Sequence, residues 1–221
     1  MANGGAGKSC PDGSPEKLRW GYSLCIPPSV YDPSDDTYMI LSYLEKNVSL
    51  LENARVLDIG SGSGILSIFA VERGASHVMS VDISPKACET SQFNLRKILG
   101  ERAESVEIIA GDIDGIIRRG THFDLVLINP PYLPYDQSTG DYFLDMALYG
   151  GKKGSETSVR ILKSLEGLLS GKYTVLLVSS SLGGAEEIMK TMRSLHFITE
   201  VVDKRDYFFE RLYLLRGEKI G

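Results

Sequence analysis

The sequence predicts a doubly wound α/β fold, with a seven-stranded, mostly parallel sheet whose last strand is antiparallel. Three observations predict this class. From residue 35 onward, short apolar runs typical of buried strands alternate with longer stretches that have a helical apolar stripe. A glycine-rich loop joins the first apolar run to a helix, and polar residues stand where several other runs end. Strands that alternate with helices favour parallel pairing through right-handed crossovers.

Each element follows from a local pattern. A first helix is expected at about 35–50, with Ser34 or Asp35 as its cap. Ser84 followed by Pro85 starts another helix, because a serine cap followed by proline suits the first turn. The last two strands have little sequence between them and should pair antiparallel through a loop near Asp206. The expected strands are 54–59, 77–82, 106–109, 123–128, 173–178, 197–203 and 208–216, and the other helices begin near 65 or span 85–99, 156–169 and 186–195.

Composition predicts one domain at residues 29–221, preceded by a partly disordered N-terminal tail at 1–28. No apolar stretch approaches the ~20 residues that cross a bilayer, and the N-terminus lacks the apolar core of a signal peptide. We therefore expect a cytoplasmic protein. The net charge of -5 argues against broad electrostatic binding to nucleic acid.

Three scattered cysteines, Cys10, Cys25 and Cys88, form no CxxC pair. Neither a zinc site nor a disulfide framework follows from this spacing, so we expect three free thiols and no metal.

The segment DIGSGSG places Gly60, Gly62 and Gly64 between a strand and a helix, where glycine lets the backbone approach a ligand closely. Asp82 ends the next strand and could hold the two hydroxyls of a ribose. Asp112 ends the third strand and could accept a hydrogen bond from an exocyclic amino group. Since ligands of open α/β sheets bind at the carboxyl ends of the strands, these residues predict a nucleotide-like ligand there.

The spacing DxGxGxG, which begins at Asp58, differs from the dinucleotide fingerprint GxGxxG and resembles motif I of class I S-adenosylmethionine-dependent methyltransferases. That resemblance implies a Rossmann-like class I methyltransferase fold over about 31–216 and S-adenosyl-L-methionine as cofactor. The implied cofactor-binding residues are Thr37, Asp58, Gly60, Gly62, Gly64, Asp82, Asp112, Ile113 and Asn129.

The sequence Asn129-Pro130-Pro131-Tyr132 follows the fourth predicted strand and should reach the same cleft. Methyl transfer to a planar nitrogen requires that the nitrogen be aimed at the methyl carbon. The Asn129 side-chain oxygen and the Pro130 carbonyl could each accept one N–H and stabilise the positive charge that grows on nitrogen. The two prolines restrict the backbone, and Tyr132 could stack on a planar substrate.

This segment resembles the [N/D/S]PP[Y/F/W] motif of methyltransferases that act on adenine, cytosine or guanine amino groups and on glutamine amides. The resemblance implies that Asn129, Pro130 and Tyr132 are catalytic and that Asn129, Pro131 and Tyr132 bind substrate.

Upstream, VYDPSDDTYMILSYLE at 30–45 resembles the entry segment of short archaeal and eukaryotic HemK-like (PrmC-like) enzymes, with Thr37 at the cofactor-contacting position. ALYGGKKGSETSVRIL at 147–162 resembles a glycine segment of the same family, although Tyr149 and Ser155 depart from its pattern.

The HemK-like resemblance implies a release-factor glutamine methyltransferase, whose substrate is the Gly-Gly-Gln motif of a class I translation release factor. It also implies a possible zinc-ribbon activator subunit near the third strand, which the run at 106–109 could contact. The alternatives are a nucleic-acid amino methyltransferase, a protein-lysine methyltransferase and a non-catalytic cofactor-binding subunit. Nucleic-acid enzymes of this kind usually carry a recognition domain or a basic surface. The sequence leaves no room for such a domain and its net charge is negative, although residues 150–221 have a surplus of +3 that could form a local basic patch.

Overall fold

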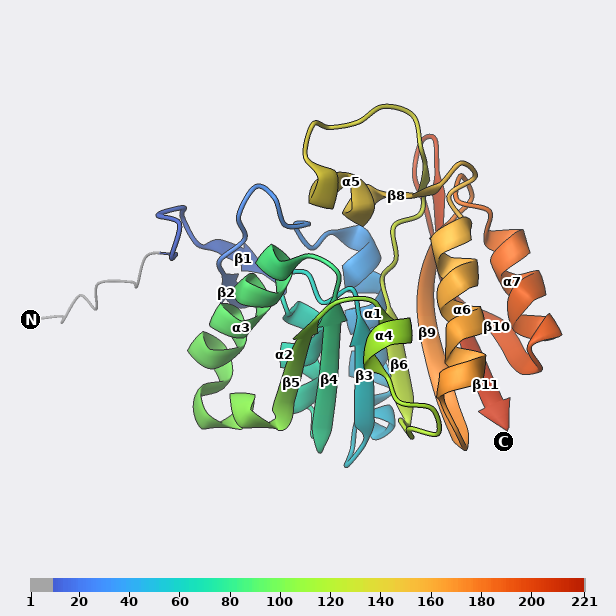
Figure 1. The fold of residues 1–221 in the computed structure, drawn as a ribbon, viewed down its shortest axis with the longest axis horizontal. Coiled ribbons are helices and arrows are strands. Elements are labelled where there is room, and N and C mark those ends of the chain that lie inside the picture. The colour runs from blue at the N-terminus through green and yellow to red at the C-terminus, as the bar shows by residue number, and fades with distance from the viewer. Residues whose placement is uncertain (1–9, 221) are drawn as a thin grey trace, which may run out of the picture.

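The computed structural model describes residues 10–220 and contains a seven-stranded sheet with the strand order β10-β11-β9-β6-β3-β4-β5 (Figure 1). The pairs within β3, β4, β5, β6 and β9 are parallel, whereas β11 runs antiparallel to both β9 and β10. The predicted fold class is therefore confirmed, including its antiparallel last strand. The strands are β3 (Arg55–Ile59), β4 (His77–Asp82), β5 (Val106–Ala110), β6 (Leu125–Ile128), β9 (Lys172–Ser180), β10 (Phe197–Asp206) and β11 (Arg211–Ile220).

Helices cover both faces of this sheet. One apolar core joins α1, α2 and α3 to one face, and a second core joins α4, α6 and α7 to the other. Alternating residues of a strand enter different cores, as Val56 and Leu57 of β3 do. The helices are α1 (Asp35–Lys46), α2 (Ile65–Glu72), α3 (Pro85–Leu99), α4 (Ile113–Ile116), α5 (Tyr142–Leu148), α6 (Glu156–Leu168) and α7 (Ala185–Ser194).

The predicted helix start at Ser84 and Pro85 is confirmed. The Ser84 hydroxyl accepts a hydrogen bond from the Ala87 amide, and Pro85 stands in the first turn of α3. The first helix is shorter than expected: α1 ends at Lys46, and a 3₁₀ turn (Val48–Leu50) follows.

The N-terminal segment contains a hairpin of β1 (Lys17–Arg19) and β2 (Tyr22–Leu24). Leu24 and Ile26 are buried in the core with α1, α2 and α3, so this part of the expected tail packs against the sheet domain. Residues 1–9 of that tail lie outside the described residues, and the domain boundary at residue 28 stays a prediction.

The expectation of three free thiols is wrong for Cys10 and Cys25, which form a disulfide with their Cα atoms 5.4 Å apart. The intervening hairpin folds the chain back and brings the two residues together. The spacing of the cysteines in the sequence does not predict this contact. Cys88 is a buried free thiol, as expected, and burial raises its pKa to about 11.

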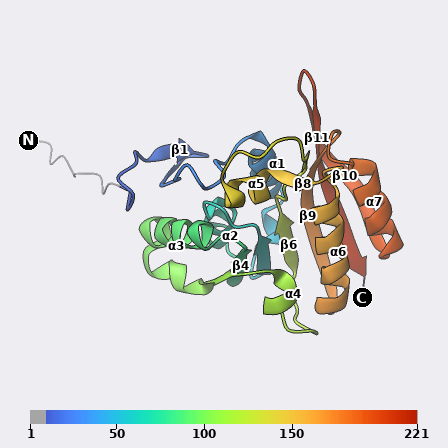
Figure 2. The same ribbon diagram turned by 45° about the horizontal axis from the view of Figure 1, so that its top comes forward.

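A small layer lies across the carboxyl ends of the central strands. It consists of α5 and the short parallel pair of β7 (Leu133–Pro134) and β8 (Tyr149–Gly151), which Figure 2 shows above the ends of β6 and β9. None of the helices within residues 10–220 is long and apolar enough to span a membrane.

Candidate active site

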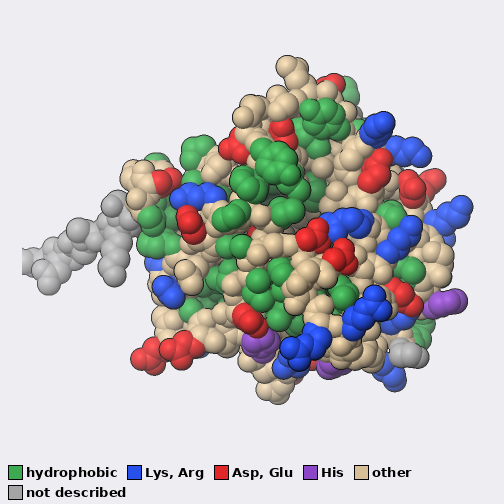
Figure 3. Space-filling model, viewed as in Figure 1, with side chains coloured by type: hydrophobic (Ala, Val, Ile, Leu, Met, Phe, Trp, Pro, Cys, Tyr) green, Lys and Arg blue, Asp and Glu red, His purple; other side chains and the backbone are tan. Residues whose placement is uncertain are grey.

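A cavity of about 640 Å³ opens at the carboxyl ends of β3, β4, β5 and β6. The N-terminal segment, the glycine loop, the NPPY segment and the α5–β8 layer all contribute to its wall. On the face seen in Figure 3, apolar side chains gather over α5 and below it, whereas charged side chains gather over α6 and α7. Most of the predicted site residues line this cavity: Thr37, Gly60, Gly62, Asp82, Asp112, Ile113, Asn129, Pro130, Pro131 and Tyr132.

The glycine loop is held against the end of β4 by Asp82. One carboxylate oxygen accepts a hydrogen bond from the Gly62 amide and the other from the Ser84 amide, each at 2.9 Å. Burial raises the pKa of Asp82, and these two amides oppose the rise. Asp82 thus fixes the loop while it still lines the cavity, where its remaining lone pairs can accept from hydroxyl groups.

Gly64 does not line the cavity but starts α2 with a φ of 83°. A Cβ at this position would lie 3.1 Å from the Ser91 Cα and closer still to its side chain. Glycine is required here for the backbone conformation and for the close approach of α2 to α3.

Asp58 lies beneath the loop rather than in the cavity. It is fully buried, and one of its oxygens accepts a 2.6 Å hydrogen bond from the Ser67 hydroxyl. Burial raises its pKa to about 6. The position does not match a direct cofactor contact and instead links β3 to α2.

Asp112 and Ile113 begin α4 at the far end of the cavity. The Asp112 carboxylate accepts a 2.9 Å hydrogen bond from the Arg160 guanidinium of α6, which also contacts Asp114 at 3.2 Å. Arg160, which the sequence analysis does not single out, therefore neutralises part of the acidic charge at this end.

The Asn129 side chain is fixed by a chain of hydrogen bonds. Its Nδ2 donates to the Thr37 hydroxyl at 3.0 Å, and that hydroxyl donates to Asp36 at 3.2 Å. Because Asp36 only accepts, the direction of both bonds assigns Nδ2 to Thr37 and leaves Oδ1 on the other side of the amide. The Asn129 Oδ1 atom is buried and has no hydrogen-bond partner within residues 10–220.

Asp36 is a further candidate site residue that sequence reasoning missed. It is only 2% exposed, and its carboxylate accepts hydrogen bonds from the Tyr31 hydroxyl at 2.8 Å and the Tyr132 hydroxyl at 3.2 Å. Burial and the negative charge of Asp36 raise the pKa of both tyrosines, which are therefore neutral donors. The adjacent aspartates of the 30–45 segment were a signal, but only the fold brings Tyr132 to them.

The second glycine segment supports the NPPY backbone. A Cβ on Gly150 would lie 2.4 Å from the Pro131 carbonyl oxygen, and a Cβ on Gly154 would lie 2.2 Å from that of Tyr132. Gly183 packs against the same Tyr132 oxygen, where a Cβ would lie at 2.3 Å. The resemblance at 147–162 thus corresponds to a close packing contact, which side chains at these positions would prevent.

The fold and the site together define a class I methyltransferase. The defining features are the sheet order with its single antiparallel strand and a cavity at the carboxyl ends of the strands, beside a glycine loop and an NPPY segment. Comparison with known proteins agrees with this class. A family model described as "Conserved hypothetical protein 95" matches residues 39–142. Among solved structures, a chain of the "E. cuniculi Mtq2-Trm112 complex" superposes with a TM-score of 0.64 at 22% identity, over 86% of this chain and 99% of that one. A methyltransferase from Pyrococcus furiosus gives a TM-score of 0.62 at 21% identity, over 90% and 89% of the two chains.

Proteins of similar sequence show which family of methyltransferases the chain belongs to. MJ0928 of Methanocaldococcus jannaschii, which is named as a protein N5-glutamine methyltransferase, is 31% identical over 90% of this chain and 97% of its own length. Human methyltransferase HEMK2 is 30% identical over 75% of this chain and 78% of its own length. The chain belongs to the HemK-like family of methyltransferases.

Proposed function

We propose that this chain is an S-adenosyl-L-methionine-dependent methyltransferase that methylates the side-chain amide of the glutamine in the Gly-Gly-Gln motif of a class I translation release factor. The observation that carries the proposal is the buried, unpartnered Oδ1 of Asn129, held at the cavity by Thr37 and Asp36. A buried acceptor without a partner is costly, and an incoming N–H removes that cost. The names of MJ0928 and of the fission yeast "eRF1 methyltransferase catalytic subunit mtq2", which is 29% identical to this chain, support the choice of substrate.

The residues present fit the proposed cofactor. Asp82 and Asp112 line the cavity at the ends of neighbouring strands, as the ribose and adenine of a nucleoside require. Ser61 in the glycine loop has a buried hydroxyl with no partner within residues 10–220 and lines the same cavity. The carboxylates of Asp36 and Asp82 favour a cationic ligand. When bound, the cofactor supplies an electrophilic methyl group.

In the proposed mechanism, this chain's residues orient the acceptor amide. Asn129 Oδ1 accepts one N–H, and the Pro130 carbonyl accepts the other, which aims the nitrogen. Both oxygens stabilise the positive charge that grows on nitrogen as the new bond forms. Tyr132, held by Asp36, packs against the planar amide, and the proton leaves to water after transfer.

The test is incubation of the purified protein with labelled S-adenosylmethionine and, separately, a release factor, tRNA or rRNA, and DNA. We expect label on the release factor and its loss when the Gly-Gly-Gln glutamine is replaced. Label only in nucleic acid would contradict the proposal, as would label on a lysine. Cofactor binding without transfer to any of these would favour a non-catalytic subunit.

Asn129→Ala separates catalysis from cofactor binding. We expect turnover to fall roughly 10²-fold or more, the scale for loss of one charge-stabilising contact, with little change in cofactor affinity. Unchanged turnover would remove Asn129 from the mechanism.

The proposal includes a possible small zinc-ribbon activator subunit. The strand β5 is the edge of the sheet in the part of the chain described, and its Val106, Ile108 and Ile109 side chains are half-buried. An edge strand can pair with another chain through its free backbone groups. The solved complex of E. cuniculi Mtq2 with Trm112 supports this choice. An active, soluble monomer that binds cofactor tightly would contradict an obligate activator.

A further inference from the structure

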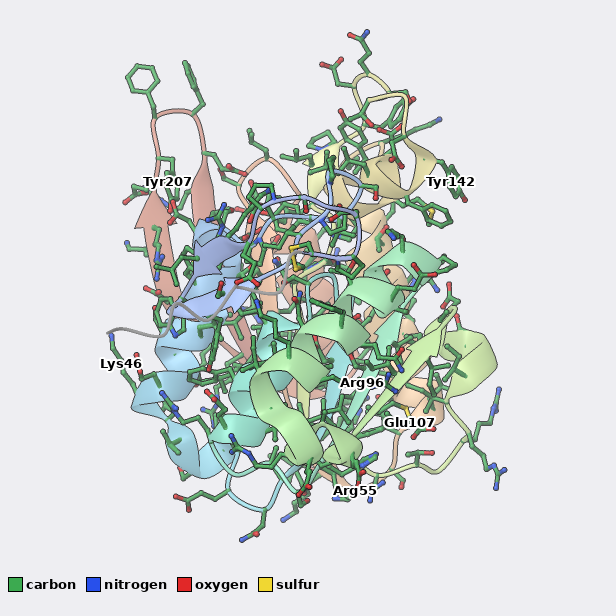
Figure 4. The ribbon with its side chains drawn as sticks, turned by 90° about the vertical axis from the view of Figure 1, so that its left-hand side faces the viewer. Lys46, Arg55, Arg96, Glu107, Tyr142 and Tyr207 are labelled. Atoms are coloured by element: carbon green, nitrogen blue, oxygen red, sulfur yellow. A yellow bond between two sulfur atoms is a disulfide. The ribbon has the colours of Figure 1, made fainter. Side chains whose placement is uncertain are left out.

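Exposed aromatic side chains gather at the same edge of the molecule as the cavity. Phe208 and Phe209, in the turn between β10 and β11, are 92% and 83% exposed, and Tyr207 beside them is also exposed. Tyr135, on the segment that leads into α5, and Tyr142, the first residue of α5, are also exposed. Figure 4 shows the turn near Tyr207 and the segment near Tyr142 as two projections on one side of the molecule.

The β10–β11 turn is held in a defined position. The Tyr207 amide donates to the Glu210 carbonyl at 2.7 Å, which closes the turn around Phe208 and Phe209. Below it, the Arg205 guanidinium donates to the Asp35 carbonyl at 3.4 Å and to the Ser42 hydroxyl at 3.3 Å. Turns usually carry Gly, Asn, Asp, Pro or Ser at their central positions, so the turn itself does not call for two phenylalanines.

The turn also reaches the cavity. Glu210, the residue after Phe209, lines it together with Asp36 and Tyr132. Its Oε1 atom is buried and has no hydrogen-bond partner in the described chain. The exposed phenylalanines of the turn are therefore directly followed in the chain by Glu210, whose unpartnered acceptor atom lies in the cavity wall.

We propose that the β10–β11 turn docks the protein substrate: Phe208 and Phe209 pack against apolar side chains beside the acceptor loop, and Glu210 accepts a hydrogen bond from an N–H of that loop. This inference rests on the proposed function and adds the surface that recognises the folded substrate. Aromatic side chains that become buried on binding are the common energetic centres of protein interfaces.

The charge at the cavity favours a protein loop over a nucleic acid or a membrane. Glu210 directly follows the phenylalanines, and Asp36 lies in the same cavity wall. These carboxylates repel a phosphate backbone. Insertion of Phe208 and Phe209 into lipid would carry the Glu210 charge toward the membrane, which is costly.

The test compares wild-type protein with the double variant Phe208→Ser/Phe209→Ser. Ile198→Ser is the matched control, because Ile198 is an exposed apolar residue near the opposite end of β10. Substrates are a purified class I release factor and a short peptide that carries its Gly-Gly-Gln motif. We expect KM for the release factor to rise about 10- to 100-fold in the double variant, the scale for two interface aromatics. KM for the peptide, cofactor affinity and the kinetics of Ile198→Ser should change less than about twofold.

A second variant, Glu210→Gln, keeps the turn and removes one charge. We expect KM to rise for both substrates, because the peptide retains the N–H donor and the neutral glutamine oxygen accepts a weaker hydrogen bond than the Glu210 carboxylate does. Docking is overturned if the double variant methylates the release factor with wild-type KM, and the proposed function then still stands. If wild-type protein methylates no release factor, the proposed function fails and docking fails with it. Loss of vesicle or RNA binding in the double variant, with unchanged KM for the release factor, would assign the turn to those ligands instead.

Discussion

At the scale of single residues, Asp36 accepts hydrogen bonds from Tyr31, Tyr132 and Thr37 while almost completely buried. Asp36→Asn removes the charge and replaces one acceptor oxygen by a donor, so at least one of these partners loses its bond. We expect turnover to fall about 10- to 100-fold, which corresponds to about 1–3 kcal/mol of misplaced hydrogen bonding.

Glu45→Gln is the matched control for this change, because Glu45 lies on the same helix with its side chain exposed. Its turnover should equal that of wild-type protein. Wild-type turnover in Asp36→Asn would show that Asn129 and Tyr132 need no support from this carboxylate.

The buried Asp58 carboxyl should make the free energy of unfolding depend on pH. Its pKa is about 6 in the folded protein and 3.8 in an unfolded chain, because burial disfavours the charged form. The folded state therefore binds more protons between these values, and stability falls as pH rises from about 4 to about 6. The loss amounts to at most about 3 kcal/mol, at 1.36 kcal/mol for each pKa unit. Asp58→Asn lacks this titration, so urea unfolding should show its stability relative to wild type rising over that window and then levelling off. If the stabilities of Asp58→Asn and wild-type protein changed equally with pH over this window, the raised pKa of Asp58 would be contradicted.

At the scale of elements, the sequence allowed the seven strands and the long helices to be predicted because each carries a strong local pattern. The β1–β2 hairpin, α4, α5 and the β7–β8 pair were not predicted. These elements have only two to seven residues and little apolar periodicity, so contacts with the rest of the fold decide their conformation. Strand β10 extends to Asp206, beyond its expected end at 203, since much of it is exposed and its polar residues gave no strand signal. Strand β11 begins at Arg211 rather than at 208 and ends at Ile220 rather than at 216, because residues 207–210 form the turn.

Gly154 tests how the α5–β8 layer supports the site. It has a φ of 83°, and a Cβ there would meet the Tyr132 carbonyl oxygen. We expect Gly154→Ala to lower the free energy of unfolding by about 1–3 kcal/mol and to reduce turnover as the NPPY backbone shifts. In contrast, Gly167→Ala in α6 should be stabilising by about 0.5–1 kcal/mol, because no atom of residues 10–220 outside its chain neighbours and its own helix backbone lies within 4 Å of the added Cβ. Thermal unfolding and turnover of the two variants measure the difference, and equal behaviour would contradict the packing argument.

At the scale of the whole molecule, the cavity is assembled from segments far apart in the chain. Sequence patterns identified the glycine loop, the strand-end acids and the NPPY segment, because each carries its chemistry within a few residues. They did not identify Arg160 beside Asp112 or Glu210 in the cavity wall, because those contacts depend on how α6 and the β10–β11 turn pack. The same holds for the disulfide between Cys10 and Cys25.

Asn94 joins three of these distant segments and provides the test at this scale. It is fully buried on α3, where Oδ1 accepts from the Cys25 amide and Nδ2 donates to the carbonyls of Cys25 and Ser63, all at 2.9 Å. Asn94→Ala leaves these groups without their partner, so we expect a loss of about 3 kcal/mol or more in stability. Cofactor affinity should fall as well, because Ser63 belongs to the glycine loop. Ser91→Ala is the matched control, since the buried Ser91 hydroxyl has no partner in the described chain and its loss should cost little. Calorimetry with and without cofactor measures both effects, and a variant that loses stability but keeps wild-type cofactor affinity would show that the N-terminal segment and the glycine loop are not coupled through Asn94.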